Sequence, residues 1–308
     1  MSEQVSQRRQ RLNVFTFSSR LLVRYCAYPV LLVAVVATAV VALRDHLDLG
    51  QVSALFLAGT IAYLAVLERV IPYERGWHPS RREWGWYGLY LVLTIATSSV
   101  AQLLVTSLVG VLAVRVPVIP LWAEIPTALL LGSLASYVVH RLAHTRPLLW
   151  RLHGVHHVPQ KVNVANNGVN HVFDVLFEQG VVQLSLALVG FSQESVFVVG
   201  LFVVAQGYFV HTNADIRLGP LNYVFASPEQ HRLHHSTDLS EAGHYGSDLS
   251  VWDLMFGSFT WRPGRTPVAI GLTDPASFPR TDAVLATFFH PWRRRPAAPS
   301  PEAGGPAA

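Results

Sequence analysis

The sequence predicts an all-α fold: a multi-pass transmembrane helical bundle with a cytoplasmic, histidine-rich cap that binds two metal ions. Three observations support this prediction. Of the 308 residues, 51% are hydrophobic and only 14% are charged, whereas a soluble domain averages about 25% charged residues. Several apolar runs approach the length of about 20 residues that crosses a bilayer as a helix. Eleven of the 14 histidines lie between His140 and His244.

Four apolar runs precede the clustered histidines, and each is predicted to be a membrane helix. A fifth apolar stretch, Val172–Val210, is interrupted by the polar sequence at 190–195 and is therefore predicted to be a helical hairpin. The four earlier helices are expected over Tyr25–Leu43, Val52–Leu67, Tyr87–Val105 and Pro120–Val139.

The charges beside these runs predict the orientation in the membrane, because cytoplasmic loops carry the excess of Lys and Arg. The N-terminal arm is basic, the loop at 44–50 carries Asp45 and Asp48, and the loop after the second helix carries four arginines. The N-terminus is therefore expected inside, and four crossings return the chain to the cytoplasmic side at His140. The hairpin then places His171 and His211 on that same face.

We therefore divide the chain into four parts: a basic cytoplasmic arm (1–24), transmembrane helices 1–4 (25–139), a histidine-box domain with a membrane hairpin at about 172–210 (140–260), and a C-terminal segment with a disordered tail (261–308). The absence of an ER retrieval signal and the arginine- and alanine-rich composition favour a bacterial cytoplasmic membrane. Arginines beside membrane segments explain the net charge of +4, so nucleic acid is not an expected partner.

The clustered histidines have spacings that suit metal binding. On a helix, positions i and i+3 or i+4 share a face, so each group can direct several imidazoles to one point. A ligand set made only of nitrogen suits Zn, Fe, Cu or Ni, and one zinc needs three or four such ligands. The set is large enough for two ions; it consists of His140, His144, His153, His156, His157, His171, His211, His231, His234 and His235. The single cysteine, Cys26, excludes a cysteine-ligated zinc or an iron–sulfur cluster carried by this chain alone.

Several segments around these histidines resemble the fatty acid hydroxylase/sterol desaturase superfamily. The resemblance covers roughly Tyr137–Phe259, and it includes the fourteen-residue step from His157 to His171. The segments that carry it are H-R-L-A-H, L-W-R-L-H-G-V-H-H, H-T-N, G-P-L-N-Y, H-R-L-H-H and Y-G-S-D-L-S-V-W-D-L-M-F-G.

The resemblance implies an integral-membrane, non-haem di-iron oxidoreductase whose histidine boxes hold two iron ions (Fe²⁺/Fe³⁺) on the cytosolic side; zinc can replace iron on purification. The boxes correspond to His140 and His144, to His153, His156 and His157, and to His231, His234 and His235. His211 matches the histidine at the end of the last membrane segment. The chain departs from many relatives at Asn170-His171-Val172 and at His244. His171 therefore either binds metal or supports a ligand, and His244 is either a supporting residue or a surface residue.

Polar and basic residues close to the boxes have two interpretations each. Asn167, Asn170, Asp174, Asn213, Asp248 and Asp253 either fix histidine ligands by hydrogen bonds or cap helices and turns. Arg141, Arg146, Arg151 and Arg232 either dock an acidic electron carrier or contact lipid headgroups.

Taken together, these patterns predict an O2-dependent enzyme that hydroxylates or desaturates a membrane lipid such as a sterol or fatty-acyl chain. The sequence contains no Walker A motif, no nucleophile elbow and no dinucleotide fingerprint after a strand. An external donor is therefore expected to supply electrons, such as a cytochrome b5-like protein or a ferredoxin. Ether-lipid oxygenation and carotenoid hydroxylation remain alternatives, as does a non-catalytic zinc-binding membrane scaffold or sensor.

Overall fold

The computed structural model describes residues 2–112 and 119–293, with no side chains described for 2–18 and 112. The elements within these ranges are helices, which confirms the predicted all-α fold. Within the described ranges, six helices are long and apolar enough to cross a membrane. They are α1 (Ser2–Arg44), with its candidate span at Ser19–Arg44, α2 (Leu49–Val70), α3 (Arg81–Leu112), α4 (Leu121–Thr145), α6 (Val172–Val189) and α7 (Gln193–Val210).

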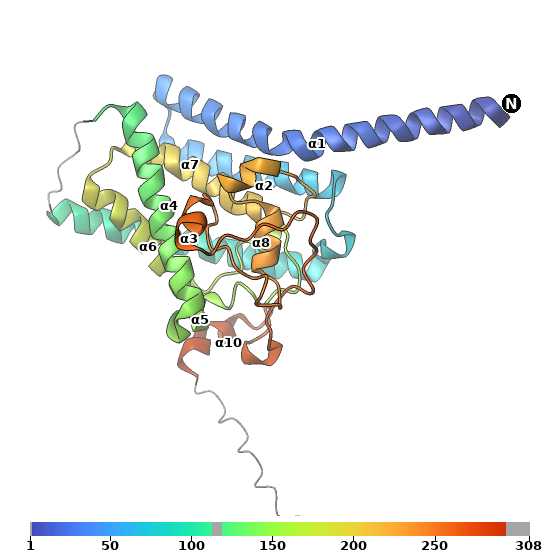
Figure 1. Cartoon of the computed structure of the whole chain (residues 1–308). Coiled ribbons are helices and arrows are strands. Elements are labelled where there is room, and N and C mark those ends of the chain that lie inside the picture. Colours follow the sequence, from blue (N-terminus) through green and yellow to red (C-terminus); the bar gives the residue numbers. More distant parts are fainter. Residues whose placement is uncertain (1, 113–118, 294–308) are drawn as a thin grey trace, which may run out of the picture.

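The first four membrane helices extend beyond the expected ranges: α2 and α3 are longer at both ends, and the extensions of α1 and α4 involve the predicted arm and the first histidine box. Helix α1 begins at Ser2 and therefore includes most of the arm predicted at 1–24. Its N-terminal part projects away from the other helices (Figure 1). Helix α4 continues past the expected end at Val139 to Thr145, so its last two turns carry His140 and His144. The tail that the sequence predicts to be disordered falls largely in residues 294–308, outside the described ranges.

The outer helices present apolar side chains to their surroundings. Only 11% of the most apolar window of α3 is buried inside the protein, compared with 56% for α7. Such extensive exposed apolar surface is rare on a soluble monomer, whereas it is the expected surface of a helix that faces hydrocarbon. Helix α7 is the central helix of the bundle and packs against α1, α2 and α4.

The predicted hairpin between α6 and α7 is present and has a defined turn. Gly190 ends α6 with φ 80°, a left-handed conformation that glycine adopts without steric cost. Ser192 caps α7 by accepting a hydrogen bond from the Ser195 amide. The buried carboxylate of Glu124 in α4 accepts hydrogen bonds from the Ser192 amide and from the hydroxyls of Ser192 and Ser195. The turn is thereby tied to α4.

Short helices and loops form the cap that follows α4 and α7. Helix α5 continues from the end of α4, α8 lies beside the bundle, and α10 lies near α5 (Figure 1). The short elements are η1 (Arg75–Trp77), α5 (Pro147–His153), η2 (Val164–Asn166), η3 (Gly219–Tyr223), α8 (Pro228–His234), α9 (Val251–Phe256), η4 (Pro275–Ser277), α10 (Val284–Phe289) and η5 (His290–Trp292).

Candidate metal centre

Four separate segments bring nine of the ten predicted histidines together. The first box lies in the last two turns of α4. The second begins at the last residue of α5 and continues into the turn after it, so only His153 of this box is helical. His211 follows the last residue of α7, and the third box occupies α8 and its C-cap, His235. The central position of α7 thus places His211 among boxes that are distant in the sequence.

The start of α8 is fixed by local sequence, which sets the direction of the third box. Ser227 and Gln230 form a reciprocal capping box, and Pro228 occupies the first helical turn. The helix then places His231 and His234 one turn apart, as the H-x-x-H-H spacing predicts.

The turn of the second box passes very close to an aromatic ring. A Cβ atom on Gly154 would lie 2.3 Å from Cζ of Phe278. Glycine is therefore the residue that lets the chain between His153 and His156 approach this ring, which in turn packs against Trp150.

The nine histidines form two compact groups. The candidate ligand atoms within each group lie within 4.8 Å of one another, and in the described residues both groups consist of histidine alone. The groups adjoin, because the rings of His157 and His235 stack with centroids 4.2 Å apart. The five-histidine group consists of His140, His144, His153, His157 and His234, and the four-histidine group of His156, His211, His231 and His235.

Hydrogen bonds fix the tautomer of several of these rings. The Nδ1–H group of His153 donates to Asp174 at 2.9 Å, and that of His156 donates to the Val169 carbonyl at 3.2 Å. The Nδ1–H group of His211 donates to the Asn163 carbonyl at 3.0 Å. A ring that donates from Nδ1 has its lone pair on Nε2, which is the arrangement found in histidines that bind metals.

Many of the other ring nitrogens in the two groups are buried and lack partners, although Nε2 of His231 and Nε2 of His235 lie 3.0 Å apart and share a hydrogen bond. The Nε2 atoms of six histidines have no hydrogen-bond partner among the described residues. An unsatisfied buried polar atom costs about 1–3 kcal/mol, so a cluster of them requires an explanation. A metal ion within each group would satisfy these atoms. They belong to His140, His144, His153, His157, His211 and His234.

Burial also favours the neutral, metal-binding form of three imidazoles outside the membrane helices, those of His156, His211 and His234. It lowers the pKa of His211 to about 4, and it lowers the pKa of His156 and His234 well below the ordinary value. For His156 and His234, the neighbouring imidazoles lower the pKa further, because a second positive charge close by is unfavourable.

A buried carboxylate that the sequence analysis did not identify supports the four-histidine group. Glu68, near the end of α2, accepts hydrogen bonds from the amides of Val164 at 2.7 Å and Asn213 at 2.8 Å. Val164 directly follows Asn163, whose carbonyl accepts the hydrogen bond from His211, and Asn213 lies just after His211. Glu68 therefore links the segments on both sides of this hydrogen bond. The available signal was an acidic residue directly after an apolar run, since ionisable residues in membrane helices usually have a function.

The tenth predicted ligand, His171, lies outside both groups. It caps α6, where its Nδ1 accepts a hydrogen bond from the Phe173 amide. Its Nε2 lies 3.1 Å from the carbonyl oxygen of Phe288 and donates to it. Both ring nitrogens are thus engaged by the protein, and the ring packs against Phe173 and Phe288.

The polar residues near the boxes have different roles in the structure. Asp174 bonds to a histidine, whereas Asp248 accepts hydrogen bonds from the Ser133 hydroxyl and the Leu249 amide. Asn213 donates to the Glu74 carbonyl and supports a loop. Asn170 donates to the carbonyl of Asn167.

The four arginines near the boxes also differ. Arg232 is only 2% exposed, and its guanidinium lies 3.9 Å from the centroid of the Tyr73 ring, so it is not part of a docking surface. Arg141 donates to the Tyr137 hydroxyl, and Arg151 donates to backbone carbonyls of the C-terminal segment. Arg146 is exposed.

The described residues therefore fit a pair of metal ions. Two adjoining, all-nitrogen groups of four and five ligands suit borderline transition metals rather than Mg²⁺ or Ca²⁺. Part of this centre lies at the C-terminal ends of two candidate membrane spans, α4 and α7.

Comparison with known proteins agrees with this arrangement. Residues 125–258 match the fatty acid hydroxylase family. The chain is 30% identical over 297 residues to ornithine lipid hydroxylase OlsE from Rhizobium tropici, covering 92% of this chain and 88% of the relative. It is 32% identical over 145 residues to alkylglycerol monooxygenase from Danio rerio and 30% identical over 156 residues to the human protein.

The extent of these matches differs. The alkylglycerol monooxygenase matches cover 46% and 50% of this chain but only 31% and 34% of those proteins. No solved structure matches the chain significantly. The Rhizobium relative aligns over nearly the whole chain, and the family match contains all nine clustered histidines. The chain therefore belongs to the fatty acid hydroxylase family.

Proposed function

We propose that this protein is a membrane-embedded oxidoreductase that hydroxylates a lipid with O2, using two iron ions held by the nine clustered histidines. The observation that supports this proposal most directly is the pair of buried histidine groups, whose unpartnered Nε2 atoms come together from four separate segments. Bound iron would supply the oxidising chemistry for cleaving an unactivated C–H bond, which acidic and basic side chains cannot provide.

The protein's own residues would prepare the site for that chemistry. Asp174 and the carbonyls of Val169 and Asn163 hold three rings in one tautomer, so their Nε2 atoms remain available. Burial excludes water and favours the neutral form of His156, His211 and His234, which reduces competition between protons and the metal.

Electrons for the reaction would come from a separate carrier. Hydroxylation with O2 inserts one oxygen atom and releases the other as water, which consumes electrons. The sequence has no motif for a nicotinamide or flavin cofactor, so we propose a cytochrome b5-like protein, a ferredoxin or a similar donor. The positive-inside pattern supports a cytoplasmic position for the histidine boxes and hence for the donor.

A cavity beside the centre fits the polar head of a lipid. The cavity measures about 400 Å³ and is lined by charges of both signs, including Lys161, Glu83 and Asp282. Val158, the residue after the candidate ligand His157, forms part of its wall. The first turns of the candidate membrane span α3 form another part, which supports a position of the cavity at headgroup depth.

The charged lining of this cavity indicates the class of headgroup. Lys161 pairs with Glu83 at 2.8 Å, and Arg82 pairs with Asp282 at 3.0 Å. Ion pairs of partly exposed side chains contribute only about 0–1 kcal/mol, so a ligand can replace them at little cost. We propose a headgroup that carries both a cationic and an anionic group.

The relatives' names support a lipid substrate. One relative is an ornithine lipid hydroxylase, and others are alkylglycerol monooxygenases. The former aligns over nearly the full chain, which favours hydroxylation of a lipid with a polar head. Oxygenation of an ether lipid is compatible with the same centre.

Metal analysis and turnover of the purified full-length protein test the proposal. The protein is loaded with Fe²⁺ in lipid nanodiscs and supplied with a chemical reductant. O2 uptake is then measured, and the lipid products are identified by mass spectrometry. We expect two irons per chain, O2 uptake and a lipid product heavier by one oxygen atom. Tightly held zinc that iron cannot replace, without O2 uptake, would instead indicate a zinc-binding scaffold.

A further inference from the structure

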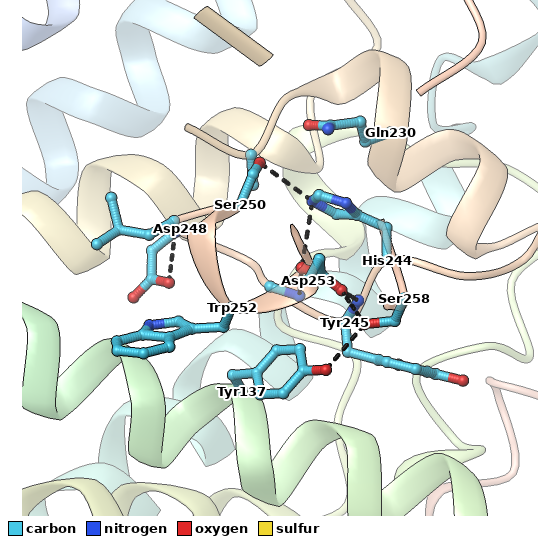
Figure 2. A network of polar contacts seen from close by, with 12 residues as sticks. Tyr137, Gln230, His244, Tyr245, Asp248, Ser250, Trp252, Asp253 and Ser258 are labelled. Atoms are coloured by element: carbon cyan, nitrogen blue, oxygen red, sulfur yellow. Dashed lines mark hydrogen bonds and ion pairs between the residues drawn. The ribbon is translucent and has the colours of Figure 1, made fainter. Parts of the chain in front are cut away.

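Asp253 in α9 is a buried carboxylate at the centre of a polar network (Figure 2). This network contacts His140 of the five-histidine group. The Asp253 side chain is 0% exposed. Its Oδ1 accepts hydrogen bonds from the Tyr245 amide and the Ser258 hydroxyl, both at 2.7 Å, and its Oδ2 accepts one from the Gly246 amide at 2.8 Å. These three donors satisfy a charge that would otherwise be costly to bury.

The backbone at 244–246 has a conformation that this carboxylate can stabilise. His244 has φ 70°, the left-handed region that non-glycine residues seldom adopt. A Cβ atom on Gly246 would lie 2.7 Å from Asp253 Oδ2 and 2.6 Å from the Leu249 carbonyl oxygen. Glycine at 246 therefore allows the carboxylate to reach the backbone amides directly.

The same backbone segment contacts a candidate metal ligand. The carbonyl oxygen of Tyr245 accepts a hydrogen bond from Nδ1–H of His140 at 2.6 Å. The Nε2 atom of His140 is buried without a partner and belongs to the five-histidine group.

One planar peptide joins these two interactions. The Tyr245 carbonyl and the Gly246 amide belong to the same peptide unit, and planarity makes them point in opposite directions. Asp253 binds the N–H end of this unit, and His140 binds the C=O end. A hydrogen bond at one end polarises the unit and strengthens the bond at the other.

The network also connects back to the helix that carries His140. The Ser258 hydroxyl, which donates to Asp253, lies 2.8 Å from the Tyr137 hydroxyl. Tyr137 lies on α4, about one turn before His140, so both ends of the network meet on the same helix.

From this geometry we infer that Asp253 is a positioning residue for the five-histidine group: through the Tyr245–Gly246 peptide it fixes the tautomer and orientation of His140, so that Nε2 faces the metal. The inference rests on the proposed function only in that the five-histidine group binds a metal ion. Asp253 itself does not touch the metal or the substrate.

Cobalt binding by the metal-free, full-length protein in detergent tests this role. Co²⁺ is titrated into the wild type, Asp253→Asn and the control Asp248→Asn, and binding is followed by visible absorption. Asp248 is a matched control because it is also a buried aspartate of this segment, yet it bonds to Ser133 and Leu249 instead of the 245–246 peptide. His140→Ala identifies which absorption band belongs to the five-histidine group.

We expect Asp253→Asn to weaken Co²⁺ binding by about 10–100-fold at one site, the site that His140→Ala removes. Binding at the other site should be unchanged. The asparagine amide has one acceptor oxygen and an NH2 group, so it cannot accept hydrogen bonds from all three donors. Asp248→Asn should bind both ions as the wild type does. If Asp253→Asn fails to fold, Ser258→Ala should weaken the same site to a smaller extent.

Two results would overturn the inference. One is wild-type affinity at both sites in folded Asp253→Asn. The other is equal weakening of both sites together with a lower unfolding temperature, which a general structural role would produce. A wild-type protein that binds no Co²⁺ would instead overturn the proposed metal centre itself.

Discussion

Replacement of Gly154 with alanine should destabilise the turn that carries the second histidine box. Gly154 has φ −57° and ψ −17°, which alanine adopts readily, so backbone strain does not contribute. The added Cβ would lie 2.3 Å from Cζ of Phe278 and 2.9 Å from both Cε atoms. Because Phe278 is 7% exposed and packs against Trp150 and His290, its ring has little room to move.

The magnitude follows from two opposing effects. Overpacking a well-packed interior costs about 1–3 kcal/mol, whereas replacing glycine stabilises by about 0.4–1 kcal/mol through the unfolded chain. We therefore expect Gly154→Ala to lower the free energy of unfolding by about 1–2 kcal/mol. The displaced turn should also bind metal more weakly, because it carries His153 at one end and His156 at the other.

Thermal unfolding of the purified metal-free protein measures this effect. The matched control is Gly180→Ala in α6, where an added Cβ has no neighbour within 4 Å and should be neutral or stabilising. Phe278→Leu removes the clashing Cζ atom, so the double variant should be more stable than the sum of the two single changes predicts. A Gly154→Ala protein at least as stable as the wild type, with unchanged metal binding, would refute the reasoning.

Three further predictions concern the metal centre and the cavity. His156→Ala and His234→Ala remove one ligand from different groups, so each should abolish lipid turnover and reduce the iron content measured by mass spectrometry; full activity in either variant contradicts the assignment. Lys161→Gln should raise KM for the lipid several-fold with kcat unchanged. The control is Arg44→Gln, whose partner is the exposed Asp45, and it should alter neither constant. Equal kinetics in both variants would argue against the headgroup site. Removing metal with a chelator should lower the unfolding temperature, and adding Fe²⁺ should restore it, because an ion bound only by the folded state stabilises that state. An unfolding temperature that does not change with metal would argue against both sites.

The membrane helices could be predicted from sequence because their signal is local. Runs of apolar residues and a polar interruption at 190–195 identified the spans and the hairpin, which the structure contains. The helix ends were less predictable, since α4 continues to Thr145 beyond the apolar run. Tertiary contacts support these last two turns, as the hydrogen bond from His140 to Tyr245 illustrates.

The histidine set was predictable from spacing, but the environment of each ring was not. His171 and His211 have the same sequence signal, a lone histidine beside an apolar stretch, and both were expected at the centre. His211 ends α7 among the other boxes, whereas His171 caps α6 and bonds to Phe288, a residue 117 positions away. Contacts of such long sequence separation have no local signature, and the same applies to the amides from Val164 and Asn213 that meet at Glu68.

The shortage of carboxylates in this chain determines how its centre can be assembled. In the described residues the two groups contain imidazoles alone, and the carboxylate of Asp174 bonds to the ring of His153 instead of joining a group. Neutral ligands do not repel one another when gathered without a metal, as buried carboxylates would. Their cost is instead the unmet hydrogen-bonding capacity of the six unpartnered Nε2 atoms, about 1–3 kcal/mol apiece. Several such costs together are comparable with a typical total stability of about 5–15 kcal/mol, so metal binding and folding of the cap should be strongly coupled.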